Sequence, residues 1–160
     1  MAISLTTEAA VTRQVREAIV QARARRYPTT LILVEDELSD EELWAHLAPR
    51  LKLAYTDLLE TEDETLQQAV RGPWPELAEW MRQAARASTG VLFVGVDELV
   101  TRWDDIERAA FFRKLLHSEA YHPTTYDSVP IMVISRLAAD LDLPPASADY
   151  GAVLDLTGVR

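Results

Sequence analysis

The sequence predicts an α/β domain in which a five-stranded, mainly parallel sheet is covered by helices on both faces, as a three-layer sandwich. The expected strands are continuous apolar runs such as "TTLILV" and "VLFVGV", which is typical of strands buried on both faces. These runs alternate with segments of ten or more residues that have helical periodicity. At 160 residues the chain has the length of one domain, and we expect residues 1–160 to form a single one.

In the first half of the chain, Thr6 or Thr7 is expected to cap a helix that runs to about Arg25. The run "TTLILV" follows as the first strand. A second helix is expected over about residues 40–51, and "KLAYTDL" is the second strand. Residues 61–72 are acidic and ambiguous, with a frayed helix as one interpretation.

The second half continues the alternation. "GPWPELAEWMRQAARAS" opens on turn residues and becomes a helix with Trp80 on its inward face, and "GVLFVGVDELV" is the third strand. A further helix starts at Asp104 or Asp105 and is expected to turn Ile106 inward. "IMVIS" and "GAVLDL" are the fourth and fifth strands.

Composition narrows the function classes. A formal net charge of -10 argues against direct nucleic-acid binding, because phosphate contacts supply most of that affinity. No apolar run approaches the roughly 18 residues of a membrane span, and the start of the chain does not read as a signal peptide. The chain has no cysteine, which fits a reducing compartment. We therefore expect a cytoplasmic protein.

Functional side chains of an open α/β sheet sit just beyond the carboxyl ends of its strands. Here those places hold "EDELSDEEL" after the first strand, Asp57 after the second, Asp97 and Glu98 after the third, and Ser135 and Arg136 after the fourth. A P-loop ATPase cradles phosphates at the first place, holds magnesium at the third and senses the γ-phosphate at the fourth.

The third and fourth places match that layout. "VLFVGVDEL" resembles a Walker B strand, with Asp97 as the acid on the magnesium side and Glu98 as the base. Ser135 occupies the polar position that ends the sensor strand of AAA-type ATPases. The same acids would also serve to cap the next helix. Magnesium is the one cofactor this pattern allows, provided that Asp97 and Glu98 are functional.

The first place differs. A phosphate loop needs glycines, whose backbone N–H groups wrap the phosphates, and a lysine. This chain has no glycine before Gly72 and no lysine before Lys52, and it carries Glu35, Asp36 and Glu37 instead. A carboxylate about 5 Å from a phosphate charge costs on the order of 3 kcal/mol at an effective dielectric of 20. We expect a degenerate phosphate loop and no ordinary ATP binding.

The order of elements resembles the small P-loop-like accessory subunits of bacteriophage-exclusion (BREX) defence systems, of the BrxF and BrxB kinds. The matching pieces are an arginine-rich leading helix, "RYPTTLILV", "LAYTDLLE", "GVLFVGVDELV", "VPIMVIS" and "GAVLDL". BrxF-type members generally have an intact phosphate loop, which this chain lacks, whereas BrxB-type members are degenerate. The resemblance implies a non-catalytic adaptor, a pseudo-ATPase that docks a larger phosphatase-like or ATPase subunit of an antiviral assembly.

Two other interpretations stay open. "LILVEDELSDEEL" also resembles the first motif of Toprim nucleases, where Glu35 would act as general acid/base and Asp97 would hold Mg²⁺. Asp36 in place of the usual glycine, and Asp97 followed directly by Glu98, depart from that motif. In the third interpretation, Asp97, Glu98 and Arg136 complete the active site of a partner ATPase in trans.

Candidate partner-binding residues fall into three groups. The acids Glu35, Asp36 and Glu37 form either a solvated helix start or a docking patch. Trp44 and Trp103 are either interface anchors or rings lying over the end of the sheet. The third group, which either stabilises a helix C-terminus or docks an acidic partner, comprises Arg23, Arg25 and Arg26.

Overall fold

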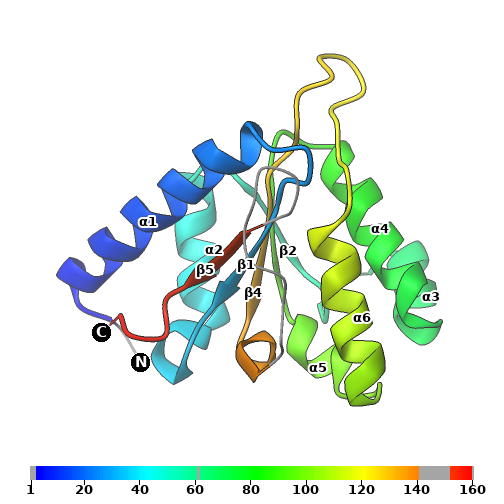
Figure 1. Cartoon of the computed structure of the whole chain (residues 1–160). Coiled ribbons are helices and arrows are strands. Elements are labelled where there is room, and N and C mark those ends of the chain that lie inside the picture. The colour runs from blue at the N-terminus through cyan, green and yellow to red at the C-terminus, as the bar shows by residue number, and fades with distance from the viewer. Residues whose placement is uncertain (1–2, 61, 141–151, 160) are drawn as a thin grey trace.

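A computed structural model describes residues 3–60, 62–140 and 152–159. Its centre is a sheet of five strands in the order β2-β3-β4-β1-β5, and every described pair of neighbouring strands is parallel (Figure 1). The α/β class and the five strands are confirmed. The strands are β1 (Thr29–Leu33), β2 (Ala54–Asp57), β3 (Val91–Val94), β4 (Ile131–Ser135) and β5 (Ala152–Asp155).

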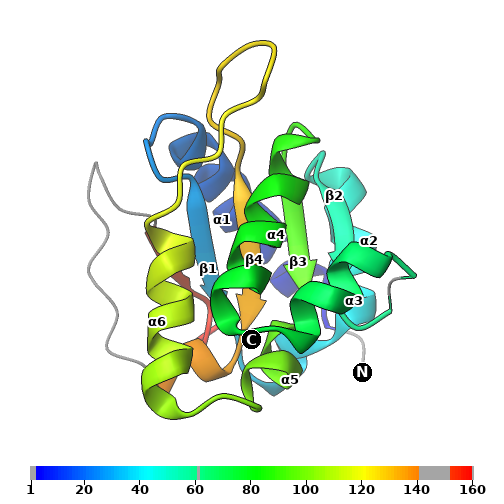
Figure 2. The ribbon, with the colours of Figure 1, turned by 90° about the vertical axis from the view of Figure 1, so that its right-hand side faces the viewer.

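Helices cover both faces of the sheet. On one face lie α1 (Leu5–Arg23) and α2 (Glu41–Arg50). On the other lie α4 (Trp74–Arg86) and α6 (Asp105–Leu116), with α3 (Glu64–Arg71) against α4 (Figure 2). The short elements are α5 (Val96–Val100) and the 3-10 turns η1 (Asp36–Ser39) and η2 (Leu137–Asp140). Among the described helices none has the length and apolar character needed to cross a membrane.

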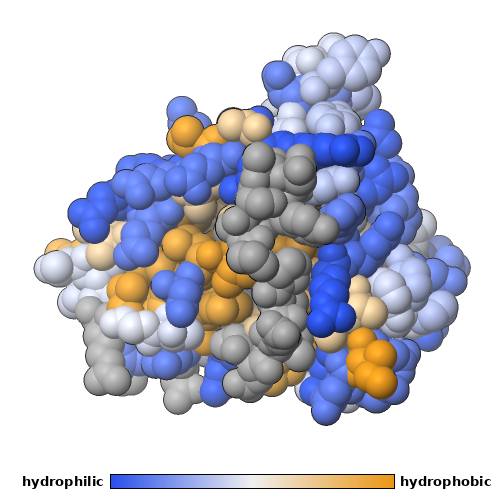
Figure 3. Space-filling model, in the orientation of Figure 1, coloured by the Kyte–Doolittle hydropathy of each residue, from blue (hydrophilic) through white to orange (hydrophobic). Residues whose placement is uncertain are grey.

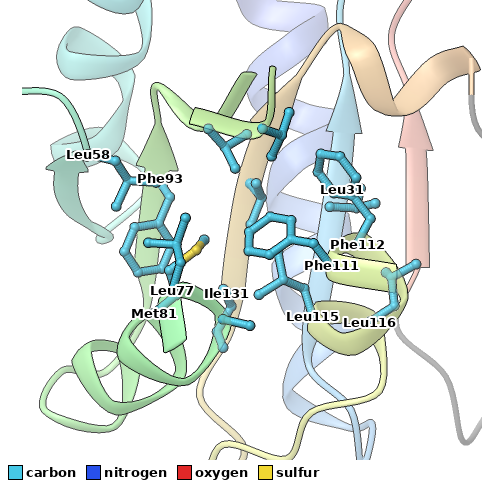
Figure 4. Close-up of a cluster of buried hydrophobic side chains, with 14 of the residues drawn as sticks. Leu31, Leu58, Leu77, Met81, Phe93, Phe111, Phe112, Leu115, Leu116 and Ile131 are labelled. Carbon is cyan, nitrogen blue, oxygen red and sulfur yellow. The ribbon is translucent and has the colours of Figure 1, made fainter. Parts of the chain in front are cut away.

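The continuous apolar runs follow from this layering, because alternate residues of each strand enter two separate cores. Leu31 and Phe93 pack beneath α4 and α6 (Figure 4), whereas Ile32 and Leu92 pack beneath α1 and α2. All four are fully buried. Burying each such side chain stabilises the fold by about 1.5–3 kcal/mol. A polar residue at any of these positions would lose that stabilisation, so the apolar runs are continuous.

Helix starts are set by local caps, and the first one differs from the prediction. Ser4 is extended and its Oγ accepts a hydrogen bond from the Thr7 backbone N–H at 3.1 Å, so Ser4, and neither Thr6 nor Thr7, is the N-cap of α1. That helix ends at Arg23, two residues before the predicted end. The ambiguous acidic segment contains α3, which begins after the N-cap Asp63.

One predicted core position is wrong, and another packs against the core without being fully buried. Ile106 is 81% exposed and does not face inward. Trp80 is only partly buried: its ring meets Phe93 edge-on at a centroid distance of 6.5 Å, and its Nε1 donates to Thr65 Oγ1 at 3.0 Å. The buried residues of α6 are Phe111, Phe112, Leu115 and Leu116, and at 3.6 residues per turn Ile106 lies on the opposite side of the helix.

The third strand is shorter than predicted. It ends at Val94, and Gly95 at φ 89° turns the chain directly into α5. This left-handed conformation favours glycine, and a Cβ at position 95 would also come within 3.1 Å of Asp57 Oδ1. Asp97 and Glu98 therefore lie on a short helix beyond the strand, not on the strand itself.

Candidate functional site

A cavity of about 790 Å³ opens at the carboxyl end of the sheet. It forms there because β4 lies between β1 and β3, so the carboxyl ends of these three strands are adjacent. The apolar part of its described wall comprises Val34, Val94, Ile134 and Leu137. The charged part comprises Glu35, Glu41, Asp97, Glu98 and Arg136. The structure thus brings together candidates from the first, third and fourth strand ends.

Asp97 connects the ends of β3 and β4. Its Oδ1 accepts a hydrogen bond from Ser135 Oγ at 2.6 Å, and its Oδ2 accepts one from the Arg136 backbone N–H at 2.7 Å. Ser135 is buried, and its Oγ in turn accepts from the Ala138 N–H at 3.0 Å. Hydrogen bonds to a carboxylate are stronger than neutral ones. Asp97 therefore holds two strand ends and the η2 turn in one arrangement.

The hydrogen bonds of Asp97 also affect how it could bind a magnesium ion. Both Asp97 oxygens already accept a hydrogen bond, although each retains lone-pair capacity. Within residues 3–60, 62–140 and 152–159, no group of three or more His, Cys, Asp or Glu side chains is arranged to hold a metal ion. Of the two other residues expected near a magnesium ion, Glu98 is exposed at the cavity, whereas Ser135 donates a hydrogen bond to Asp97.

The η1 turn follows β1, at the place where the sequence predicts a degenerate phosphate loop. Glu35 is extended, and its carbonyl accepts the Leu38 N–H at 2.9 Å. The Leu38 side chain is buried, and its carbonyl accepts Trp44 Nε1 at 2.6 Å. At the start of α2, Asp40 Oδ1 accepts the Glu42 N–H at 3.0 Å. The Asp40 carboxylate thus caps the N-terminus of α2, a kind of helix end at which anions bind when its N–H groups are free.

The electrostatics of the cavity are acidic. Its described wall carries four carboxylates against the single guanidinium of Arg136, which is exposed. Burial raises the pKa of Glu41, and the charges of Asp57, Glu98 and neighbouring acids raise it further. Burial, and then the charges of Asp57, Glu41 and neighbouring acids, raise the pKa of Tyr55 to about 12. Acids from the ends of β1, β2 and β3 therefore share one field that attracts cations.

Several predicted docking residues lie elsewhere. Trp44 is fully buried beneath the η1 turn, and Trp103 is 8% exposed with its ring 5.3 Å from that of Phe111. Both indoles belong to the core, so we remove them from the candidate docking surface. Glu37 is exposed on the turn, whereas the side chain of Asp36 lies outside the described residues.

The arginine group lies at the opposite, amino end of the sheet, where two of its members make internal contacts. Arg25 Nη2 donates to Thr30 Oγ1 at 3.0 Å, and burial lowers its pKa. Arg26 forms an ion pair with Glu119 at 2.5 Å. Arg23 is exposed in the last turn of α1. The acidic and basic candidates therefore belong to two separate surfaces.

Sequence reasoning missed two features of the cavity. Thr157, after β5, contributes to its wall, and the bend at Gly95 moves Asp97 off the strand. The glycine was a readable signal, because an isolated glycine in a strand pattern marks a bend or bulge. Comparisons with protein-family models, curated proteins and solved structures found no match to this chain.

Proposed function

We propose that this chain is a non-catalytic adaptor that binds a partner protein at the carboxyl-end cavity, on a P-loop-like scaffold with a degenerate phosphate loop. One observation carries the proposal. The backbone N–H groups at this strand end are engaged within the chain: that of Leu38 donates to the Glu35 carbonyl, and that of Glu42 donates to the Asp40 carboxylate. A nucleotide would have to displace both while approaching Glu35 and Glu41.

The strand order supports the P-loop-like part of this proposal. A strand that senses a γ-phosphate must lie beside the strand that holds the phosphates and near the one that holds the metal. Here β4 lies between β1 and β3, and its last residue, Ser135, contacts Asp97. The bend at Gly95 is a departure from that scaffold, since a Walker B acid directly continues its strand.

The chemistry of the cavity favours an arginine or lysine side chain as the group it accepts. The apolar residues Val34 and Ile134 suit an aliphatic stem, and the acids around them suit a cationic head. A guanidinium can bind carboxylates in a bidentate manner. The partner would therefore present a basic segment, and the resemblance to BREX subunits suggests a larger component of a defence assembly as its source.

Calorimetry with two ligands tests this function. Mg²⁺ with ATP at about 1 mM should give no saturable binding. A peptide rich in arginine and alanine should bind, and its affinity should fall as salt rises. Glu98→Gln should weaken peptide binding several-fold. The matched control is Glu17→Gln, an exposed glutamate on α1, which removes the same charge away from the cavity.

Two results would count against the proposal. Saturable ATP binding below about 100 μM would restore a nucleotide site. Equal loss of peptide binding in Glu98→Gln and Glu17→Gln would show that only net charge matters. In the host, deletion of the gene should abolish phage resistance if the chain belongs to a defence assembly. An unchanged efficiency of phage plating would remove the defence role from the proposal.

The trans-acting interpretation has one supporting observation: Glu98 and Arg136 are both exposed at the cavity, where a neighbouring ATPase subunit could reach them. It is tested in a reconstituted complex, where Arg136→Ala should lower the partner's ATPase rate without preventing assembly. The Toprim interpretation is less favoured, because each oxygen of Asp97 already accepts a hydrogen bond, from Ser135 or Arg136, and a metal ion would have to share that oxygen. A nuclease of that kind would lose Mn²⁺-dependent cleavage in Glu35→Gln.

A further inference from the structure

A hairpin of residues 121–128, here called the arm, projects from the amino end of the sheet beyond the surrounding helices (Figures 1 and 2). Its two sides meet in an antiparallel bridge between Tyr121 and Ser128. Its base is tied to the body: Ser128 Oγ donates to the Arg25 carbonyl at 2.7 Å, and Arg86 Nε donates to the Tyr121 carbonyl at 3.2 Å. The base of the arm is therefore held in a defined position relative to the rest of the domain.

Hydrogen bonds also order the tip of the arm. The His122 N–H donates to the Asp127 carbonyl at 2.8 Å, and the Tyr126 N–H donates to the His122 carbonyl at 2.9 Å. His122 Nδ1 accepts the N–H groups of Thr124 at 3.1 Å and Thr125 at 3.3 Å. An ordered loop loses little conformational entropy when it binds, so it is suited to docking.

Tyr126, at this tip, has an unfavourable backbone conformation. Its φ is 60°, in the left-handed region that costs a non-glycine residue roughly 1–2 kcal/mol, and it is 77% exposed. Retained strain of this kind points to a function beyond folding. Residues 123–126 carry no charge, and the arm forms a paler projection above strongly hydrophilic surface in Figure 3. Exposed tyrosine is a common anchor of protein interfaces.

The two ends of the molecule have opposite charge. The helices α1, α2, α4 and α6 run antiparallel to the strands, and each has acids in its first turn and a basic residue in its last. These charges suit the helix dipoles. The amino end around the arm is basic, because Arg23, Arg86, Arg113 and Lys114 outnumber the acids Glu119, which pairs with Arg26, and Asp127 in the arm. Arg50, in the last turn of α2, is paired with Glu8. The carboxyl end around the cavity is acidic.

We propose that the arm of one copy enters the carboxyl-end cavity of a second copy, so that copies associate head to tail. The hydroxyl groups of Thr124, Thr125 and Tyr126 are donors, and the cavity offers carboxylate acceptors above an apolar wall. The cavity, about 790 Å³ and open to solvent, has room for such a tip. Around this contact the basic end of one copy faces the acidic end of the next.

Arm and cavity are different surfaces at opposite ends, so the contact is heterologous and does not close on itself. It produces dimers and then longer chains as the concentration rises. The inference rests on the proposed function in one respect, since it uses the same cavity as a docking site. A basic segment of a partner would compete with the arm of a second copy, and partner binding would disperse the chains.

Analytical ultracentrifugation of the full chain tests the contact. The net charge of -10 repels separate copies, and salt at about 0.1 M screens this over about 10 Å while leaving contact charges effective. The average mass should rise between about 10 μM and about 1 mM protein. At about 1 M salt, where charges are screened within about 3 Å, the apparent association constant should fall at least several-fold.

Two complementary variants make the test specific. Tyr126→Gly removes the ring and relieves the backbone strain, so it should fold and keep its cavity but lose the arm's anchor. Glu98→Lys keeps the arm and disrupts the cavity. Each should remain monomeric alone, whereas a mixture should form one-to-one dimers and nothing larger. The control Val20→Ala removes an exposed apolar side chain on α1 and should associate as the wild type does.

A wild-type chain that stays monomeric at about 1 mM would overturn this inference. Association that persists in Tyr126→Gly would do the same, because another surface would then be responsible. Binding of the arginine-rich peptide to a strictly monomeric chain would leave the proposed function standing without the self-association. Tyr126-dependent association without peptide binding would support the head-to-tail contact and remove the basic partner.

Discussion

The η1 turn after β1 and the α5 turn after β3 sit at the same end of the sheet, yet they are stabilised differently. The η1 turn is held from below by buried side chains, Leu38 and Trp44, and presents acids to solvent. The α5 turn is held by a polar network in which Asp97 bonds to β4. A strand end can therefore resemble an ATPase in its residues while its polar groups serve the fold.

Among these residues, Trp44 should give the largest loss of stability when it is substituted. Trp44→Ala removes a fully buried indole and should lower the free energy of unfolding by about 3–5 kcal/mol. Trp44→Phe keeps most of the packing but leaves the Leu38 carbonyl without its donor, at a cost of about 1–3 kcal/mol. Urea denaturation measures both effects.

The matching surface variant on the same turn is Glu37→Ala. Its side chain is exposed, so we expect a change within about 0.5 kcal/mol. If Glu37→Ala destabilised the chain as strongly as Trp44→Phe, the η1 turn would depend on its acids and the contrast with the α5 turn would disappear.

The α5 turn should respond to loss of hydrogen bonds instead of loss of packing. Asp97→Asn places an amide where both carboxylate oxygens accept bonds, and we expect it to cost about 1.5–3 kcal/mol. Ser135→Ala leaves Asp97 Oδ1 and the Ala138 N–H without that partner, at a cost of about 1–3 kcal/mol.

A double-mutant cycle on Asp97 and Ser135 should give a coupling energy of about 0.5–3 kcal/mol, because the two side chains are in direct contact. The control is Glu98→Gln, the exposed neighbour, which should change stability by less than about 0.5 kcal/mol. Additive single-mutant effects would mean that the Asp97–Ser135 hydrogen bond does not stabilise the α5 turn.

These two turns also show what the sequence could predict. "IMVIS" matches β4 in full. A short apolar run that begins directly after a proline is typical of a buried strand, and the proline marks where the strand begins. The meeting of strand ends at one cavity follows from parallel topology, and the proximity of Ser135 to Asp97 confirms it. Patterns of hydrophobicity are sufficient for features of this kind.

Other features depend on contacts between distant segments, which a local pattern does not encode. The burial of Trp44 by α1 and the sheet adds contacts from distant segments, although its spacing with Leu47, Ala48 and Leu51 already matches one face of a helix. The strand containing Gly95 continues its apolar pattern through Val96, so periodicity alone extended it too far. The base of the arm is fixed by hydrogen bonds to Arg25 and Arg86, which are far away in the chain.

A smaller effect is expected at the start of α2, which connects the η1 turn to the cavity. Asp40→Ala removes the N-cap and should cost about 0.5–2 kcal/mol. Asp40→Asn retains a capping oxygen and should cost less. Neither variant should gain Mg²⁺-ATP binding in calorimetry, because Leu38 and Trp44 still fill the turn. ATP binding by Asp40→Asn would show that one carboxylate alone excludes the nucleotide.

The smallest effect concerns the shared field of the acids at the carboxyl end. The pKa of Glu41 is raised in the folded chain, first by burial and then by Asp57 and Glu98. The folded state therefore binds this proton more tightly than the unfolded chain does, and ionisation of Glu41 disfavours the fold. The stabilisation is present below the unfolded pKa and is lost as pH rises through the folded pKa.

Glu41→Gln should accordingly raise the melting temperature slightly at about pH 7, and its advantage should shrink as the pH falls towards about 4. Added salt should reduce the part that comes from neighbouring acids, whereas the part from burial should remain. Glu17→Gln, on α1 away from these acids, separates the local effect from that of removing any negative charge. A Glu41→Gln advantage that did not vary with pH would mean that packing, and not repulsion among the carboxylates, limits stability at this end of the sheet.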